Sequence, residues 1–111
     1  MWVFTRNGFF SAVKHLDRPD CLLVRARFRG DLERLAVAHR IDMAITETPE
    51  ADYRFRAVVR QADFARAMEA EARAVDYPNF KAAVHDGTAR DAAYMGCWCA
   101  VRRGQEQEAR A

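Results

Sequence analysis

Two segments of this chain alternate arginine with apolar residues, and this alternation constrains the fold more than any other feature. Successive side chains of a β-strand point to opposite faces of a sheet. Each segment therefore predicts a strand with one apolar face and one arginine face. The apolar faces would consist of Val24, Ala26 and Phe28 on the first strand and of Tyr53, Phe55, Ala57 and Val59 on the second.

If the two strands share a sheet, their arginines lie together on one surface. The predicted binding residues are Arg25, Arg27, Arg29, Arg54, Arg56 and Arg60, with Tyr53 beside them. Guanidinium groups recognise carboxylates and phosphates. The face therefore predicts an anionic partner, either an acidic protein or a nucleic acid. In the second case, bases would stack on Trp2, Phe4 or Phe10 if those rings point outward.

A different interpretation is that the arginines pair within the molecule. Acidic residues near the ends of the predicted strands could serve as partners, namely Asp17, Asp20, Asp31, Glu47 and Asp52. Surface ion pairs of this kind contribute little stability. A formal net charge of only +2 is compatible with such pairing, and it is lower than a general polyanion binder usually carries. Residues 1–60 hold 11 Lys/Arg and 8 Asp/Glu, so any basic surface belongs to this part.

The order of predicted elements indicates an α+β fold. We expect a hairpin over residues 1–16, a strand over 21–29, a helix over 32–40 capped by Asp31, and strands over 43–46 and 52–60. Helices follow over 62–75, from Asn79 to Asp86, and from Ala89 to about Arg102. We predict a mostly antiparallel sheet of four to five strands, with three to four helices packed on one face. Residues 1–103 would form a single domain, and 104–111 a flexible tail.

Cysteine usage and hydropathy favour a cytoplasmic protein without cofactor or metal. Three cysteines without a preceding signal-like segment do not suggest a secreted disulfide scaffold, and no apolar run approaches the length of a membrane span. Cys97 and Cys99 lie two positions apart on a predicted helix, so they cannot face one ion. We expect Cys97 in the core, on a stripe with Tyr94, Trp98 and Val101, and Cys99 exposed or at the edge of the core.

Catalytic groups are sparse. Ser11 and His15 share one face of a predicted strand but are about 13 Å apart at 3.3 Å per residue, so they cannot form a triad with Asp17. His39 and His85 have no evident catalytic partner. No phosphate-binding loop, zinc-protease motif or nucleophile elbow is present. We therefore predict no catalytic residues.

The junction Asp76-Tyr77-Pro78-Asn79-Phe80-Lys81 is a second candidate site. Asn79 would cap the following helix, and Lys81 would offer a cation near the positive end of that helix. The alternative is that the segment only ends one helix and starts the next.

Several separated motifs resemble a group of short uncharacterised bacterial proteins. They are Trp2-Val3-Phe4-Thr5, Gly8-Phe9-Phe10-Ser11, Val24-Arg25-Ala26-Arg27, Asp52-Tyr53-Arg54-Phe55-Arg56 and Asp76-Tyr77-Pro78-Asn79-Phe80-Lys81. The resemblance implies a one-domain bacterial protein, chromosomal or carried on a phage or other mobile element, and implies no activity. The segment Gly96-Cys97-Trp98-Cys99 departs from the pattern of the group.

Three function classes follow from these observations. The first is a non-enzymatic adaptor or inhibitor whose arginine face docks an acidic protein, and the second is a nucleic-acid-binding domain. The third is a small enzyme that acts on an anionic substrate, with Tyr53, Arg54, Arg56, His15 or Lys81 converging in a pocket. A homodimer through the open face or edge of the sheet is a further alternative.

Overall fold

The computed structural model describes residues Met1–Ala111 and divides them into two compact units, Met1–Val75 and Asp76–Ala111. The element order is three strands, a helix, two strands and three helices, as predicted. The strands form one antiparallel sheet, which confirms the α+β fold class. That residues 1–103 act as one domain with a flexible tail stays a prediction.

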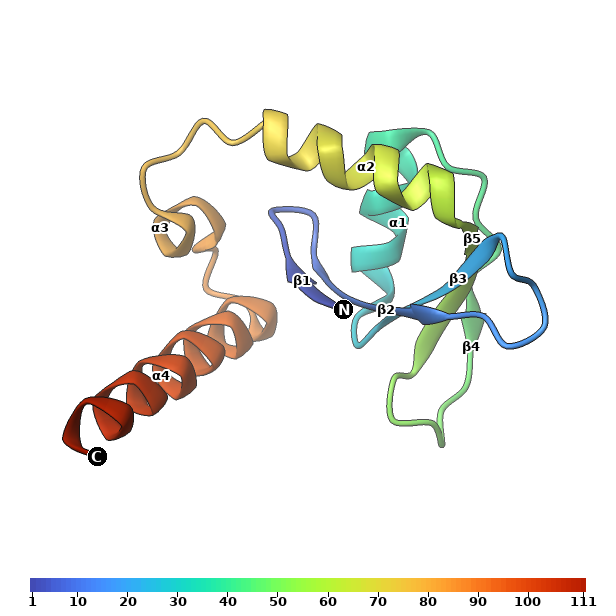
Figure 1. Cartoon of the computed structure of the whole chain (residues 1–111). Helices are drawn as coiled ribbons and strands as arrows, with labels where there is room; N and C mark the ends of the chain where they lie inside the picture. Colours follow the sequence, from blue (N-terminus) through green and yellow to red (C-terminus); the bar gives the residue numbers. More distant parts are fainter. The chain divides into compact units, whose positions relative to one another are not determined.

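The sheet belongs to the first unit and has the strand order β1-β2-β3-β5-β4 (Figure 1). Its strands are β1 (Trp2–Phe4), β2 (Phe9–Lys14), β3 (Cys21–Ala26), β4 (Thr46–Glu47) and β5 (Phe55–Arg60). Three predicted bounds are wrong: β3 ends before Arg27, β4 starts at Thr46 rather than Met43, and β5 starts at Phe55 rather than Asp52. The first difference arises because helix α1 begins only three residues after β3 ends.

Helices α1 (Arg29–His39) and α2 (Gln61–Arg73) pack on one face of the sheet (Figure 1). The core is built from alternate strand residues and from the inner faces of the two helices. It includes Phe10, Ala12, Val24, Ala26, Ala57 and Val59 from the sheet and Leu32, Leu35, Phe64 and Ala67 from the helices. Phe28, predicted to join this core, is 38% exposed because it precedes α1 rather than continuing β3.

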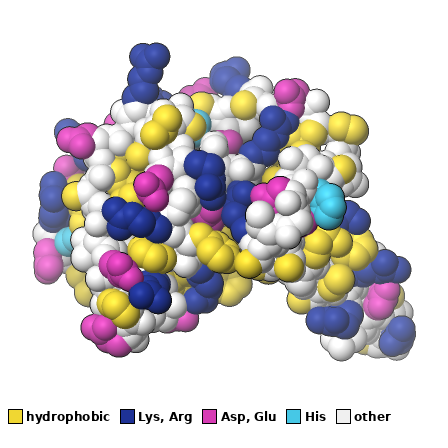
Figure 2. All heavy atoms as spheres, turned by 180° about the vertical axis from the view of Figure 1, so that it is seen from behind, with side chains coloured by type: hydrophobic (Ala, Val, Ile, Leu, Met, Phe, Trp, Pro, Cys, Tyr) yellow, Lys and Arg dark blue, Asp and Glu magenta, His cyan; other side chains and the backbone are white.

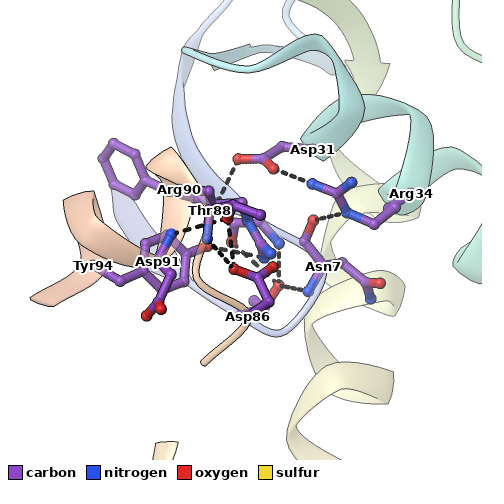
Figure 3. Close-up of polar contacts among 11 residues, drawn as sticks. Asn7, Asp31, Arg34, Asp86, Thr88, Arg90, Asp91 and Tyr94 are labelled. Atoms are coloured by element: carbon purple, nitrogen blue, oxygen red, sulfur yellow. Dashed lines mark hydrogen bonds and ion pairs between the residues drawn. The ribbon is translucent and has the colours of Figure 1, made fainter. Parts of the chain in front are cut away.

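The turn between β1 and β2 is held against α1 by a buried carboxylate. Asp31 is fully buried, and its Oδ2 accepts a hydrogen bond of 3.1 Å from the Phe9 amide. Arg34 contacts Asp31 Oδ1 and donates from Nε to the Asn7 carbonyl at 2.9 Å (Figure 3). The prediction that Asp31 caps the helix is wrong, since α1 starts two residues earlier and its N-cap is Phe28.

A second polar contact joins α1 to α2. His39 Nε2 lies 2.8 Å from Glu71 Oε1, and the two side chains are only 9% and 13% exposed. Glu71 Oε1 is also contacted by the side-chain amide of Asn7. His39 is therefore a packed histidine that links both helices and the first turn.

The second unit consists of α3 (Phe80–Val84) and α4 (Ala89–Arg110). Asn79 caps α3 as predicted, because its Oδ1 accepts from the Ala82 amide at 3.0 Å. The rings of Phe80 and Tyr94 stack with centroids 5.8 Å apart. Helix α4 does not end near Arg102 but continues to Arg110, and an ion pair of 3.1 Å between Arg102 and Glu106 supports this last part.

The predicted apolar stripe of α4 is mostly exposed. Tyr94 is buried, but Trp98 is 39% and Val101 76% exposed. The prediction of Cys97 in the core is wrong, since it is exposed, whereas Cys99 is half-buried, as expected of a residue at the edge of the core. The reason is that α3 is only five residues long. Its buried Val84 and its Phe80, which stacks on Tyr94, cover only the first turns of α4.

Candidate binding face of the sheet

The sheet face opposite α1 and α2 carries side chains that alternate with the core residues. We call it the outer sheet face, and define it by Trp2, Phe4, Phe9, Ser11, Val13, Leu23, Arg25, Arg56 and Val58. Strand register sorts these side chains into rows. One row crosses all five strands and contains Trp2, Ser11, Arg25, Arg56 and Thr46.

The register confirms that the two predicted arginine strands share a face. Arg25 on β3 is the direct cross-strand partner of Arg56 on β5. Both side chains are half-buried. Two arginine residues are therefore direct cross-strand neighbours in the middle of the sheet.

Neither of these two arginines is neutralised by a carboxylate. Arg25 donates from Nη2 to the Ser11 hydroxyl at 2.8 Å, and Arg56 donates from Nη2 to the Tyr53 carbonyl at 3.3 Å. The Nε atoms of both are buried without a hydrogen-bond partner. For this pair, the interpretation that the arginines are paired internally with acidic residues does not hold.

Tyr53 is buried, but on the arginine side rather than in the core. It precedes the first residue of β5, so the strand alternation that placed it with Phe55 does not apply. Its ring centroid is 4.6 Å from Arg25 Cζ and 4.2 Å from Arg27 Cζ. These cation–π contacts fix the position of both guanidinium groups.

Arg27 and Arg54 do form ion pairs, and in these two cases the predicted internal pairing is present. Arg27 Nη1 lies 3.2 Å from Asp52 Oδ1 and donates to the Asp52 carbonyl at 2.8 Å. Arg54 Nε lies 2.7 Å from Glu47 Oε1. All four side chains are more than 40% exposed, so these pairs contribute little stability and remain accessible.

The remaining predicted binding residues do not belong to the outer sheet face. Arg29 is the first residue of α1 and pairs with Glu33 at 3.6 Å, because β3 has already ended. Arg60 is the exposed last residue of β5, opposite Cys21. Lys81 belongs to the second unit, where its Nζ is 3.8 Å from the centroid of the Trp98 ring.

Aromatic residues of the first hairpin extend the outer sheet face. Trp2 is 72% and Phe4 37% exposed. The rings of Phe4 and Phe9 stack at 4.4 Å, and Trp2 meets Phe9 edge-on at 6.1 Å. Phe10, the third ring considered for stacking, is fully buried in the core.

An apolar row completes the face and was not predicted from the sequence. Val13, Leu23 and Val58 are cross-strand neighbours on β2, β3 and β5, and none of them is buried. The only sequence signal for this row is that Val13 shares strand parity with Phe9 and Ser11. Alternation is hard to recognise there, because the intervening residues Phe10 and Ala12 are also apolar.

The groups considered for catalysis have other roles. The Ser11 hydroxyl is bound to Arg25 and the residue is 1% exposed. His15 Nδ1 accepts from the Asp17 and Arg18 amides at 3.1 Å and so shapes the turn after β2. In the structure, Ser11 and His15 therefore make separate contacts.

The surface charge is mixed. On the side seen in Figure 2, Lys and Arg side chains are interspersed with hydrophobic and acidic ones instead of forming one continuous basic area. This distribution agrees with the small net charge of +2. It favours recognition by a few placed cations over general attraction of polyanions.

No protein-family model, curated protein or solved structure matches this chain. None of the helices combines the length and the apolar character that a membrane span requires. No three His, Cys, Asp or Glu side chains are placed to hold a metal ion together. The outer sheet face is thus the main basis for assigning a function.

Proposed function

We propose that the outer sheet face docks an acidic protein, so that the chain acts as a non-enzymatic binding module of the adaptor or inhibitor type. The observation that carries this proposal is that Arg25 and Arg56 are direct cross-strand neighbours and that neither has a carboxylate partner. A partner carboxylate beside them would supply the missing charge.

The apolar row supports a protein partner over a nucleic acid. Val13, Leu23 and Val58 offer aliphatic surface beside the arginines. Protein interfaces combine such apolar area with arginine and aromatic side chains, and arginine and tryptophan are common among the residues that dominate their affinity. A phosphate backbone offers nothing to cover an aliphatic row.

Nucleic-acid binding is the second candidate, and the exposed rings favour it. Trp2 and the Phe4–Phe9 stack could receive unstacked bases, with Arg25 close by in the same row as Trp2. Base stacking on aromatic rings beside cations is how many single-strand binding surfaces work.

The test is affinity capture from an extract of the native host with the tagged full chain, in the presence and absence of nuclease, followed by mass spectrometry. The proposal predicts an acidic protein that is retained after nuclease treatment. Loss of all partners after nuclease treatment, together with a steep log-linear fall of affinity with salt, would support the nucleic-acid candidate instead. Light scattering on the purified chain shows whether a second copy occupies the face.

A further inference from the structure

A groove of about 740 Å³ lies in the first unit beside helix α2, and of the residues of the outer sheet face only Val13 lines it. Its walls include Ala12 and Leu22 from the sheet and Phe64, Ala65 and Met68 from the helix. Pockets that hold small molecules usually measure about 300–1,000 Å³. The groove therefore has room for a small ligand.

The position of α2 explains the groove. The helix packs over β3 and β5 and not over β2, so the flank of the helix and the neighbouring surface of β2 leave a space between them. Leu22 and Met68 are only partly buried against the core at this place. The groove is thus an accessible apolar extension of the core surface.

The polar groups of the groove favour an anion. Lys14 is the only charged side chain in the lining, which contains no Asp or Glu. Lys14 is exposed and forms no ion pair. Gln61, the first residue of α2, also lines the groove, and this helix start has no side-chain cap. The helix dipole is positive at this end; the Gln61 amide donates to the Asp20 carbonyl at 2.9 Å, and Asp63 in the first turn pairs with Arg66 at 3.6 Å.

Two further titratable groups belong to the wall. The ammonium of Met1 donates to the Ala12 carbonyl at 2.8 Å, and the thiol of Cys21 is neutral. Cys21 is 2% exposed, and burial raises the pKa of its thiol above the ordinary value of 9.0. A protonated thiol contributes apolar surface. No residue of the wall is acidic, and the nearest carboxylate shown, that of Asp20, accepts from the Cys21 thiol at 3.5 Å.

We propose that this groove binds an amphiphilic carboxylate of the fatty-acid type. The acyl chain would lie along Phe64, Ala65 and Met68, and the carboxylate would meet Lys14. The groove contains neither arginine of the pair and shares only Val13 with the outer sheet face, so the acyl-chain site can be tested apart from the proposed function.

The experiment is isothermal titration of the full chain with decanoate, octanoate and the neutral control decanol. We expect saturable binding of one decanoate, and about 15-fold weaker binding of octanoate because it buries two fewer methylene groups. Decanol should bind more weakly than decanoate. No saturable binding up to about 1 mM, or equal affinities for decanoate and decanol, overturns the proposal.

Two variants locate the site. Ala65 is exposed on α2, so Ala65→Trp should fill the groove without unfolding the chain and weaken decanoate binding at least about tenfold. Ala62→Trp, on the same helix but outside the groove, is the matched control and should bind normally. Lys14→Met should weaken decanoate binding about threefold to fivefold and leave decanol binding unchanged. Unchanged decanoate binding by a folded Ala65→Trp chain overturns the assignment.

Discussion

Arg25 and Arg56 lie directly opposite each other on strands β3 and β5, and no carboxylate neutralises either of them. Like charges that face each other across strands are destabilising. Their juxtaposition therefore supports the proposal that an anionic group of a partner binds beside them.

Changing Arg27 and Arg56 together to serine should preserve folding and weaken capture of the partner. Arg27 loses an exposed ion pair with Asp52, a hydrogen bond to the Asp52 carbonyl and a cation–π contact with the Tyr53 ring, and Arg56 loses one hydrogen bond of 3.3 Å. We expect a loss of about 1–2 kcal/mol in the free energy of unfolding. Urea denaturation and affinity capture measure the two effects.

The matched control is Arg29→Ser combined with Arg73→Ser. Both arginines are exposed, lie on helices, and form i,i+4 ion pairs with Glu33 and Glu69. This chain should capture the partner normally. Equal loss of capture in both double variants would mean that only total charge matters, against the proposed site.

Removing the ring of Tyr53 should destabilise the fold by about 3–5 kcal/mol, as for other buried aromatic residues. The ring is 3% exposed and contacts both Arg25 and Arg27. Tyr53→Phe should cost less than about 0.5 kcal/mol, because the hydrogen bond that Tyr53 accepts goes to its carbonyl rather than its hydroxyl. Chemical denaturation of Tyr53→Ala and Tyr53→Phe compares them. A Phe variant as unstable as the Ala variant would contradict this account of the ring.

Gly8→Ala should destabilise the first unit by about 1–3 kcal/mol. A Cβ at Gly8 would lie 2.4 Å from both Cβ and Cγ of Asp31, which is fully buried. Gly104→Ala is the control, since a Cβ there meets nothing within 4 Å and should stabilise helix α4 by about 0.5–1 kcal/mol. Thermal melts of the two variants should shift in opposite directions.

Trp98→Ala should cost only about 1–2 kcal/mol, less than a core tryptophan. The side chain is 39% exposed, and its ring contacts Lys81 at 3.8 Å and Arg102 at 5.4 Å. Trp98→Phe should retain part of this contribution. A loss of 3–5 kcal/mol in the Ala variant, measured by urea denaturation, would restore Trp98 to the core.

Asp86 gives the second unit a pH dependence. Hydrogen bonds from the hydroxyl and the amide of Thr88 lower the pKa of this carboxyl below its ordinary value of 3.8. Because the folded pKa is below the unfolded one, the stabilisation is present above pH 3.8 and is lost as the pH falls through the folded pKa. Titration of the carboxyl by NMR should show the pKa of Asp86 rise toward normal in Thr88→Val and stay low in Thr88→Ser.

The α+β fold could be predicted because its signals are local. Strand alternation, the turn after β1 and the cap at Asn79 act within a few residues. The ends of helices and strands are harder to predict, because they depend on tertiary contacts. Helix α1, for example, begins at Arg29, and Asp31 in its first turn binds the Phe9 amide 22 residues away in the sequence. The polar composition after Arg102 predicts a flexible tail, but the i,i+4 ion pair between Arg102 and Glu106 supports the helix there, and α4 continues to Arg110.

The candidate site was predicted only in part. Alternation placed Arg25 and Arg56 on one face, and the register confirms it. It failed for Tyr53 and Arg29, because alternation has meaning only inside a strand and both residues lie beyond strand ends. The apolar row of Val13, Leu23 and Val58 depends on the register of three strands, which no single segment encodes.

The buried bond between Asp31 and the Phe9 amide also bears on how the chain acquires order during synthesis. The first hairpin leaves the ribosome before the carboxylate that anchors its turn, because Asp31 follows Phe9 by 22 residues. Until α1 has emerged, the β1–β2 ribbon lacks both this anchor and the apolar helix surface that covers it. An isolated two-stranded ribbon is only marginally stable in water, so the earliest stable nascent species should already contain the first helix.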